Sequence, residues 1–92
     1  MREVTRPPPM VHMLLVDDDS DYCKVFAISL KTDRRVSFKI ETAHTLESAR
    51  KLLQTKNFQL VLLDLGLPDS QGLATFEKIA TAHPEVACVI LS

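Results

Sequence analysis

The order of apolar repeats along this chain is the feature that most limits its fold. Continuous apolar runs typical of buried strands, at residues 11–16, 60–63 and 86–91, alternate with segments whose apolar residues recur every three or four positions. A fourth strand, half exposed and at a sheet edge, is expected where apolar and polar residues alternate at 36–41. Strands separated by single helices pair in parallel through right-handed crossovers. The sequence therefore predicts an open, doubly wound α/β sheet.

Three helices are expected between these strands, and each has a start or stop signal. Ser20 is a candidate N-cap for the first helix, and Thr45 is one for the second. Pro84 ends the third, because proline disfavours the helical conformation at the residue before it. The apolar faces expected for the three helices are Cys23, Phe26, Ala27 and Leu30; Leu46, Ala49, Leu52 and Leu53; and Leu73, Phe76, Ile79 and Ala80.

The composition fits one small globular domain, with 46% hydrophobic and 25% charged residues in a chain of 92. A formal net charge of −1 offers no basic field for nucleic acid or an anionic membrane surface. No apolar run reaches the roughly 18 residues of a membrane span. Cys23 and Cys88, read as buried free thiols, favour a cytoplasmic protein. Residues 1–10, which contain three consecutive prolines, are expected to form a disordered leader to a domain at 11–92.

Acidic residues follow two of the predicted strands. Asp17 and Asp18 follow the first strand, Asp64 follows the third, and Ser92 follows the last. Ligands of doubly wound sheets bind at the carboxyl ends of the strands, so these three carboxylates converge if the first and third strands are neighbours. Each like-charged pair at about 4 Å then costs on the order of 4 kcal/mol, which a shared divalent cation offsets. Hard oxygen ligands favour Mg²⁺, Mn²⁺ or Ca²⁺, and an aspartate beside such an ion can act as a nucleophile towards phosphorus.

Three segments resemble the motifs of response-regulator receiver domains. Residues 14–19 (LLVDDD) resemble the first strand of that family with its acidic pair. Residues 60–73 (LVLLDLGLPDSQGL) resemble its phosphoacceptor segment, and residues 89–92 (VILS) resemble its fourth strand with the terminal hydroxyl residue. The resemblance covers residues 11–92. It implies a flavodoxin-like doubly wound parallel sheet of order 2-1-3-4, without the final helix, strand and helix of the full receiver fold.

The resemblance also implies a role for each residue of the site. Asp64 would accept a phosphoryl group, forming an aspartyl phosphate in a two-component phosphorelay, and the donor would be a histidine kinase or a phosphotransfer protein. Asp17, Asp18, Asp64 and the backbone carbonyl of Gly66 would hold Mg²⁺, with Mn²⁺ as a substitute. Ser92 would be the switch hydroxyl that turns towards the phosphate. Such a protein is a signalling module and not an enzyme, although it assists its own phosphorylation and dephosphorylation.

Two further expectations follow from the same resemblance. Pro68 and Gly72 match loop-shaping residues that touch no ligand. The family's fifth-strand lysine, which contacts the phosphoryl group, has no equivalent in this sequence. Without the final helix, strand and helix of the family, the fourth strand would form an exposed apolar edge and the first helix would lack a neighbour. We therefore expect the chain to self-associate through one of these surfaces.

The acidic residues also allow other interpretations. A non-phosphorylated, receiver-like interaction module is favoured by the missing lysine and disfavoured by the complete set of acids. A phosphatase of the haloacid dehalogenase type would use Asp17 as nucleophile and Asp19 as acid and base, but Asp21 stands where that family usually has Thr or Val. Asp17 and Asp18 could also complement a helix dipole, which leaves the segment around Asp64 unexplained.

Overall fold

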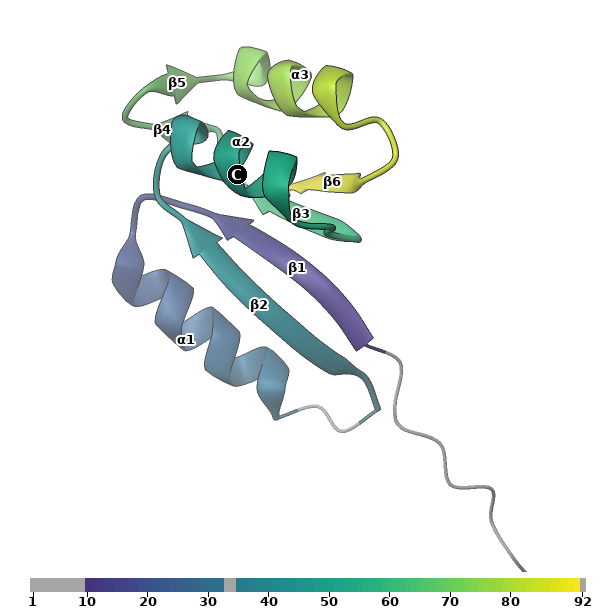
Figure 1. Ribbon diagram of the computed structural model, residues 1–92. Helices are drawn as coiled ribbons and strands as arrows, with labels where there is room; N and C mark the ends of the chain where they lie inside the picture. Colours follow the sequence, from purple (N-terminus) through teal and green to yellow (C-terminus); the bar gives the residue numbers. More distant parts are fainter. Residues whose placement is uncertain (1–9, 33–34, 92) are drawn as a thin grey trace, which may run out of the picture.

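The computed structural model describes residues 10–32 and 35–91. Over this part, the chain forms three layers, in which a parallel sheet separates one helix from two others (Figure 1). Residues 1–9 of the predicted leader lie outside the described residues, as does Ser92. Met10, the last residue assigned to the leader, begins the first strand.

Nine elements make up the described chain, and the predicted strand order is confirmed. The main sheet has the strands β1 (Met10–Val16), β2 (Ser37–Ala43), β3 (Leu60–Leu63) and β6 (Ala87–Ile90). The helices are α1 (Ser20–Lys31), α2 (Leu46–Thr55) and α3 (Leu73–Ala82). The strands β4 (Gly66–Leu67) and β5 (Ser70–Gln71) form a small antiparallel hairpin that the sequence pattern did not predict. The main sheet has the order β2-β1-β3-β6 with every pair parallel, so β6 takes the fourth predicted place.

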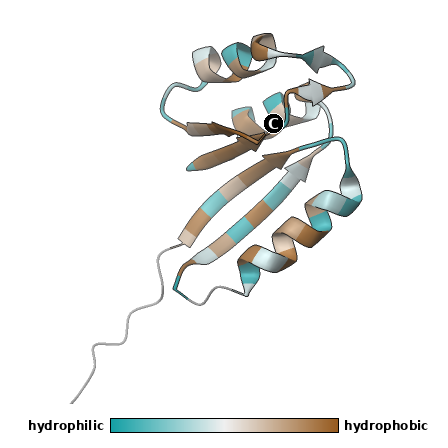
Figure 2. Cartoon of the chain, turned by 180° about the vertical axis from the view of Figure 1, so that it is seen from behind, coloured by the Kyte–Doolittle hydropathy of each residue, from teal (hydrophilic) through white to brown (hydrophobic). Residues whose placement is uncertain are grey.

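The central strand β1 is covered on both faces, as its continuous apolar run predicts. Leu14 and Val16 pack towards α2 and α3, whereas Met13 and Leu15 pack towards α1. All four side chains are at most 2% exposed. Figure 2 shows hydrophobic residues throughout β3 and β6, while the edge strand β2 alternates between hydrophobic and hydrophilic residues. The predicted edge position of β2 is therefore confirmed.

The helix starts agree with the predictions in one case and differ in another. Thr45 caps α2 as predicted, because its hydroxyl oxygen accepts the backbone N–H of Ser48 at 3.1 Å. The prediction that Ser20 caps α1 was wrong, since Ser20 is the first helical residue. Asp19 is the cap, and its Oδ1 accepts the backbone N–H of Tyr22 at 3.0 Å. Both residue types are good caps, and the extended backbone of Asp19 decides between them.

The buried face of α3 is rotated from the predicted one. Leu73 was expected to face the core, but its side chain is 63% exposed. Thr75 is fully buried instead, together with Ile79. The hydroxyl groups of Thr75 and Ser70 lie 2.7 Å apart and satisfy each other. A polar residue can therefore occupy a core position here without an unsatisfied hydrogen-bonding group.

Gly72, the N-cap residue directly before α3, has a backbone conformation that other residues rarely adopt, with φ 72° and ψ −165°. Gly72→Ala is expected to lower the free energy of unfolding by about 1–3 kcal/mol, because this region of φ and ψ is essentially confined to glycine. Gly66→Ala is the matched control, since an added Cβ there meets only Asp64 Oδ1 at 3.8 Å. Urea unfolding of both variants measures the difference. Equal losses of stability would contradict this explanation.

Two apolar surfaces remain exposed in the described part of the chain. β6 pairs only with β3 there, and Val89 and Ile90 on it are 47% and 38% exposed. On α1, Val25 and Ile28 are more than 60% exposed. These are the surfaces through which self-association was predicted, and the association itself stays a prediction. None of the helices in the described ranges has the length and apolar character needed to cross a bilayer.

Candidate functional site

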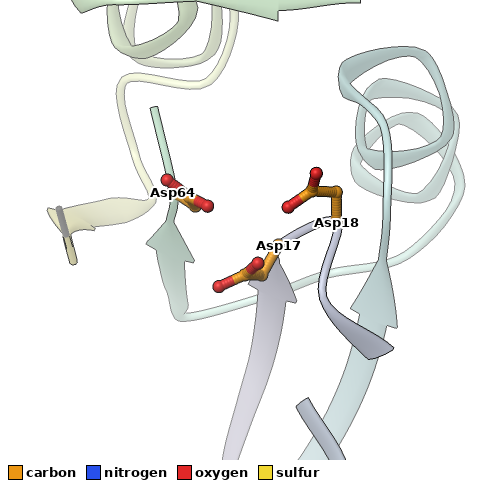
Figure 3. A group of neighbouring side chains, drawn as sticks. All are labelled: Asp17, Asp18 and Asp64. Atoms are coloured by element: carbon orange, nitrogen blue, oxygen red, sulfur yellow. The ribbon is translucent and has the colours of Figure 1, made fainter. Parts of the chain in front are cut away.

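The carboxyl ends of β1 and β3 bring the three predicted carboxylates together. Val16 is the register partner of Leu63, and the backbone N–H of Asp64 donates to the carbonyl of Val16 at 2.9 Å. Asp17 and Asp64 therefore leave adjacent strands at the same edge. One carboxylate oxygen from each of Asp17, Asp18 and Asp64 lies within 4.8 Å of the other two. Figure 3 shows the three side chains around a common space.

Asp17 is the most buried of the three, and its surroundings disfavour its charge. Asp17 is 8% exposed, whereas Asp64 is half-buried and Asp18 is exposed. Burial raises the pKa of Asp17 above its ordinary value, and the nearby carboxylates of Asp64 and Asp18 raise it further. The backbone N–H of Asp19, which donates to Asp17 Oδ1 at 2.9 Å, acts in the opposite direction. A cation between the carboxylates would remove this electrostatic cost.

The donor atoms present fit a hard divalent cation. The group consists of carboxylate oxygens, which are the ligands that Mg²⁺ and Mn²⁺ prefer. The thiol of Cys23 lies 3.8 Å from the carbonyl oxygen of Asp17. Burial and the neighbouring acids raise the pKa of this thiol, which favours its protonated form. The chemistry of the site therefore supports the predicted cofactor class.

Of the other two predicted site residues, the structure describes Gly66 but not Ser92. The backbone N–H of Gly66 donates to Asp64 Oδ1 at 3.0 Å, which fixes the orientation of the Asp64 carboxylate. The proposed contact of the Gly66 carbonyl with a metal stays a prediction. Ser92 lies outside the described residues, but Leu91 before it donates its N–H to the carbonyl of Leu63 at 2.9 Å. The chain thus reaches the same edge of the sheet one residue before Ser92.

The predicted loop-shaping residues lie directly after the site. Pro68 and Asp69 form the two-residue connection between β4 and β5. The backbone N–H of Gly72 donates to the carbonyl of Leu65 at 3.0 Å and closes the segment that follows Asp64. Proline suits a turn because its ring fixes the backbone angle φ, and glycine suits one because it can adopt positive φ. Their loop-shaping role accords with this geometry and stays a prediction.

Asp69 has a contact that the sequence did not reveal. Its two carboxylate oxygens accept the backbone N–H groups of Leu46 and Glu47, at 2.8 and 2.9 Å. These hydrogen bonds lower the pKa of Asp69. Asp69 therefore caps the first turn of α2 from a distant loop and connects that helix to the segment after Asp64. Its contribution to stability is present at neutral pH and is lost as the pH falls through its folded-state pKa.

His44 is a second residue that the sequence analysis missed. Its ring Nδ1 lies 2.8 Å from the carbonyl oxygen of Asp17. His44 directly follows β2, which neighbours β1 and ends at the same edge of the sheet. That position after a strand is the one signal in the sequence that could have drawn attention to it.

The family model of the response regulator receiver domain matches residues 13–92. The chain belongs to this family. Receiver domains of response regulators are signalling modules, and the parallel sheet order found here is the flavodoxin-like order predicted for them. Membership in the family leaves the phosphatase interpretation without support.

Curated relatives of the chain are response regulators of greater length. Response regulator protein PilR of Pseudomonas aeruginosa is 32% identical over 79 residues, which is 86% of this chain and 17% of PilR. Transcriptional regulatory protein ZraR of Klebsiella oxytoca is 28% identical over 82 residues, or 89% of this chain and 18% of ZraR. The photosynthetic apparatus regulatory protein RegA of Rhodobacter capsulatus is 29% identical over 87% of this chain and 42% of its own length. This receiver domain thus spans less than half the length of these three relatives.

Solved receiver structures share the fold. The MaeR response regulator bound to beryllium trifluoride superposes with a TM-score of 0.78 at 27% identity, over 89% of this chain and 66% of its own. The non-phosphorylated HemR receiver domain of Leptospira biflexa gives a TM-score of 0.72 at 30% identity, over 87% of this chain and 62% of its own. The predicted fold class is therefore confirmed.

Proposed function

We propose that this receiver domain is the phosphoacceptor of a two-component phosphorelay, in which Asp64 takes a phosphoryl group with the help of Mg²⁺. The observation that carries the proposal is the convergence of Asp17, Asp18 and Asp64 within 4.8 Å at the carboxyl edge of the sheet. The related MaeR regulator has been solved with beryllium trifluoride bound, and this supports a site for phosphoryl-like groups here too. The donor would be a histidine kinase or a phosphotransfer protein.

The residues of the chain divide the work of this reaction. The Asp64 carboxylate attacks phosphorus, so a bond from its oxygen to phosphorus forms as the bond from phosphorus to the donor nitrogen breaks. The Gly66 N–H orients that carboxylate from one side. Asp17, Asp18 and Asp64, with the Gly66 carbonyl, would hold the cation. When bound, Mg²⁺ neutralises charge on the phosphoryl group.

Incubation with Mg²⁺ and acetyl phosphate, followed by intact-mass measurement, tests the proposal. The wild-type protein is expected to gain the mass of one phosphoryl group, because Asp64 is an accessible carboxylate beside the cation site. Asp64→Asn should gain none, since an amide is a poor nucleophile. Asp21→Asn is the matched control, because Asp21 is an exposed acid in the first turn of α1 and outside the three-residue group. It should be modified like the wild type.

Two outcomes would count against the proposal. A gain that persists in Asp64→Asn would place the modification elsewhere. No gain in a folded wild-type protein would favour the alternative function, a receiver-like interaction module that is not phosphorylated. Far-ultraviolet circular dichroism of each sample shows whether it is folded.

The location and partners of the domain belong to the same proposal. A cytoplasmic location agrees with the two free cysteines, Cys23 and Cys88. The formal net charge of −1 gives no support for direct binding of this segment to nucleic acid. The proposed partners are the phosphodonor and, through the exposed apolar surfaces of β6 or α1, a second copy of the chain.

A further inference from the structure

The side chain of His44 forms a hydrogen bond to the main chain of a proposed metal ligand. Nδ1 of its ring lies 2.8 Å from the carbonyl oxygen of Asp17, which is 27 positions away in the sequence. A carbonyl oxygen can only accept a hydrogen bond, so Nδ1 must carry the proton in this contact. The contact therefore requires either the Nδ1–H tautomer or the charged ring.

Residues at the end of β2 form hydrogen bonds with both the N–H and the carbonyl of Asp17. The N–H of Asp17 donates to the carbonyl of Ala43 at 3.0 Å, and the next residue, His44, donates to the carbonyl of Asp17. The other group near that carbonyl is the thiol of Cys23 at 3.8 Å, which is a weak donor. His44 thus supplies the stronger of the two hydrogen bonds to the Asp17 carbonyl.

The carbonyl that His44 contacts belongs to the peptide group between Asp17 and Asp18. A peptide group is planar, so fixing its carbonyl fixes the direction of the chain at both residues. Residues 17–19 lie between the end of β1 and the start of α1 and have no regular secondary structure to hold them. Rotation about a bond that flanks this peptide would change the position of Asp18 relative to Asp17 and Asp64.

We propose that His44 is a positioning residue for the divalent cation, acting through the peptide between Asp17 and Asp18. The inference rests on the proposed function, because it concerns the same cation. His44 itself is exposed, so its removal leaves the apolar core intact. Loss of the imidazole should therefore affect metal affinity more than folding. Outer hydrogen-bond partners of metal ligands typically change affinity by about 10–100-fold when removed, and we expect the lower end of that range for a contact to the main chain.

Isothermal titration calorimetry of Mg²⁺ binding to the protein tests this role. His44→Ala is expected to raise the Kd about tenfold. His44→Asn should restore most of the affinity, because the asparagine amide nitrogen is separated from Cβ by the same number of bonds as Nδ1 of histidine. His83→Ala is the matched control, since His83 ends α3 before β6 begins, at the opposite edge of the sheet. It should bind like the wild type.

The tautomer of His44 in the metal-free protein gives an independent readout. Two-bond ¹H–¹⁵N spectra at a pH where the ring is neutral are expected to show the proton on Nδ1. A neutral ring with its proton on Nε2 would overturn the inference, because Nδ1 would then have no hydrogen to donate to Asp17.

Asp18→Ala distinguishes a failure of the proposed His44 role from a failure of the proposed cation site. If Asp18→Ala weakens Mg²⁺ binding and His44→Ala leaves the Kd unchanged, the role of His44 is refuted and the cation site stands. If the wild-type protein binds no Mg²⁺, both the cation site and the role of His44 fall. Weaker binding in His44→Ala that Asn does not restore would also count against a positioning role.

Discussion

Mg²⁺ is expected to stabilise the wild-type protein strongly and the Asp17→Asn variant very little. At a free concentration one hundred times its Kd, a ligand adds about 2.7 kcal/mol to the free energy of unfolding. In a domain of this size, that corresponds to a rise in Tm of roughly 10–20 °C. Asp17→Asn removes the charge of the most buried carboxylate in the group. Thermal scans of the variant with and without Mg²⁺ should therefore nearly coincide, and a full shift in the variant would contradict the cation site.

In EDTA, where no Mg²⁺ is bound, Asp17→Asn is expected to raise the free energy of unfolding. Burial, together with Asp64 and Asp18, raises the pKa of Asp17, so the folded protein binds this proton more tightly than the unfolded chain does. The contribution of Asp17 to stability is then greatest below its unfolded pKa and is lost as the pH rises through its folded pKa. Asparagine carries no charge at neutral or at acidic pH. Metal-free Asp17→Asn is therefore expected to be more stable than the wild type at neutral pH, and the difference should shrink in acid.

Leu14→Ala is expected to lower the free energy of unfolding by about 2–5 kcal/mol. Leu14 is fully buried in β1, between β2 and β3, and its core cluster includes residues of α2 and α3. Domains typically have only about 5–15 kcal/mol of total stability, so this loss leaves a large unfolded fraction in mild denaturant. Urea unfolding monitored by circular dichroism measures it.

Leu73→Ala is the matched control for this core substitution. Leu73 is 63% exposed at the start of α3, so the same truncation there should change stability by no more than about 0.5 kcal/mol. If the two variants lost similar stability, the assignment of the buried and exposed faces would be incorrect.

The strand framework could be predicted because each strand carries the pattern of its own surroundings. The continuous aliphatic run at 60–63 predicted β3 with the bounds that the structure has, since a strand covered on both faces needs apolar residues at every position. The alternation at 36–41 predicted an edge strand, although β2 extends to Ala43. The rule that ligands bind at the carboxyl ends of strands then brought Asp17, Asp18 and Asp64 to one edge.

The features that could not be predicted depend on polar hydrogen-bond partners, two of which contact atoms far away in the sequence. His44 and Asp69 contact backbone atoms that are 27 and 22 to 23 positions away, and a backbone atom leaves no trace in the pattern of side chains. Thr75 can be buried because Ser70 satisfies its hydroxyl, whereas the apolar pattern alone predicts Leu73 on that face. In each case a polar contact decided the outcome, over 22 or more positions for His44 and Asp69 and over five positions for Thr75. Hydrophobic periodicity does not report such contacts.

The most direct test of the shared cation site is paramagnetic broadening by Mn²⁺ in ¹H–¹⁵N spectra of the protein. At substoichiometric Mn²⁺, the amide signals of Asp17, Asp18 and Asp64 are expected to disappear first and to return when excess Mg²⁺ is added. Signals from the opposite ends of the strands, such as those of Leu60 and its register partner Ala87, should stay sharp. Broadening centred on those opposite ends, or spread evenly over the protein, would contradict a cation held by the three carboxylates.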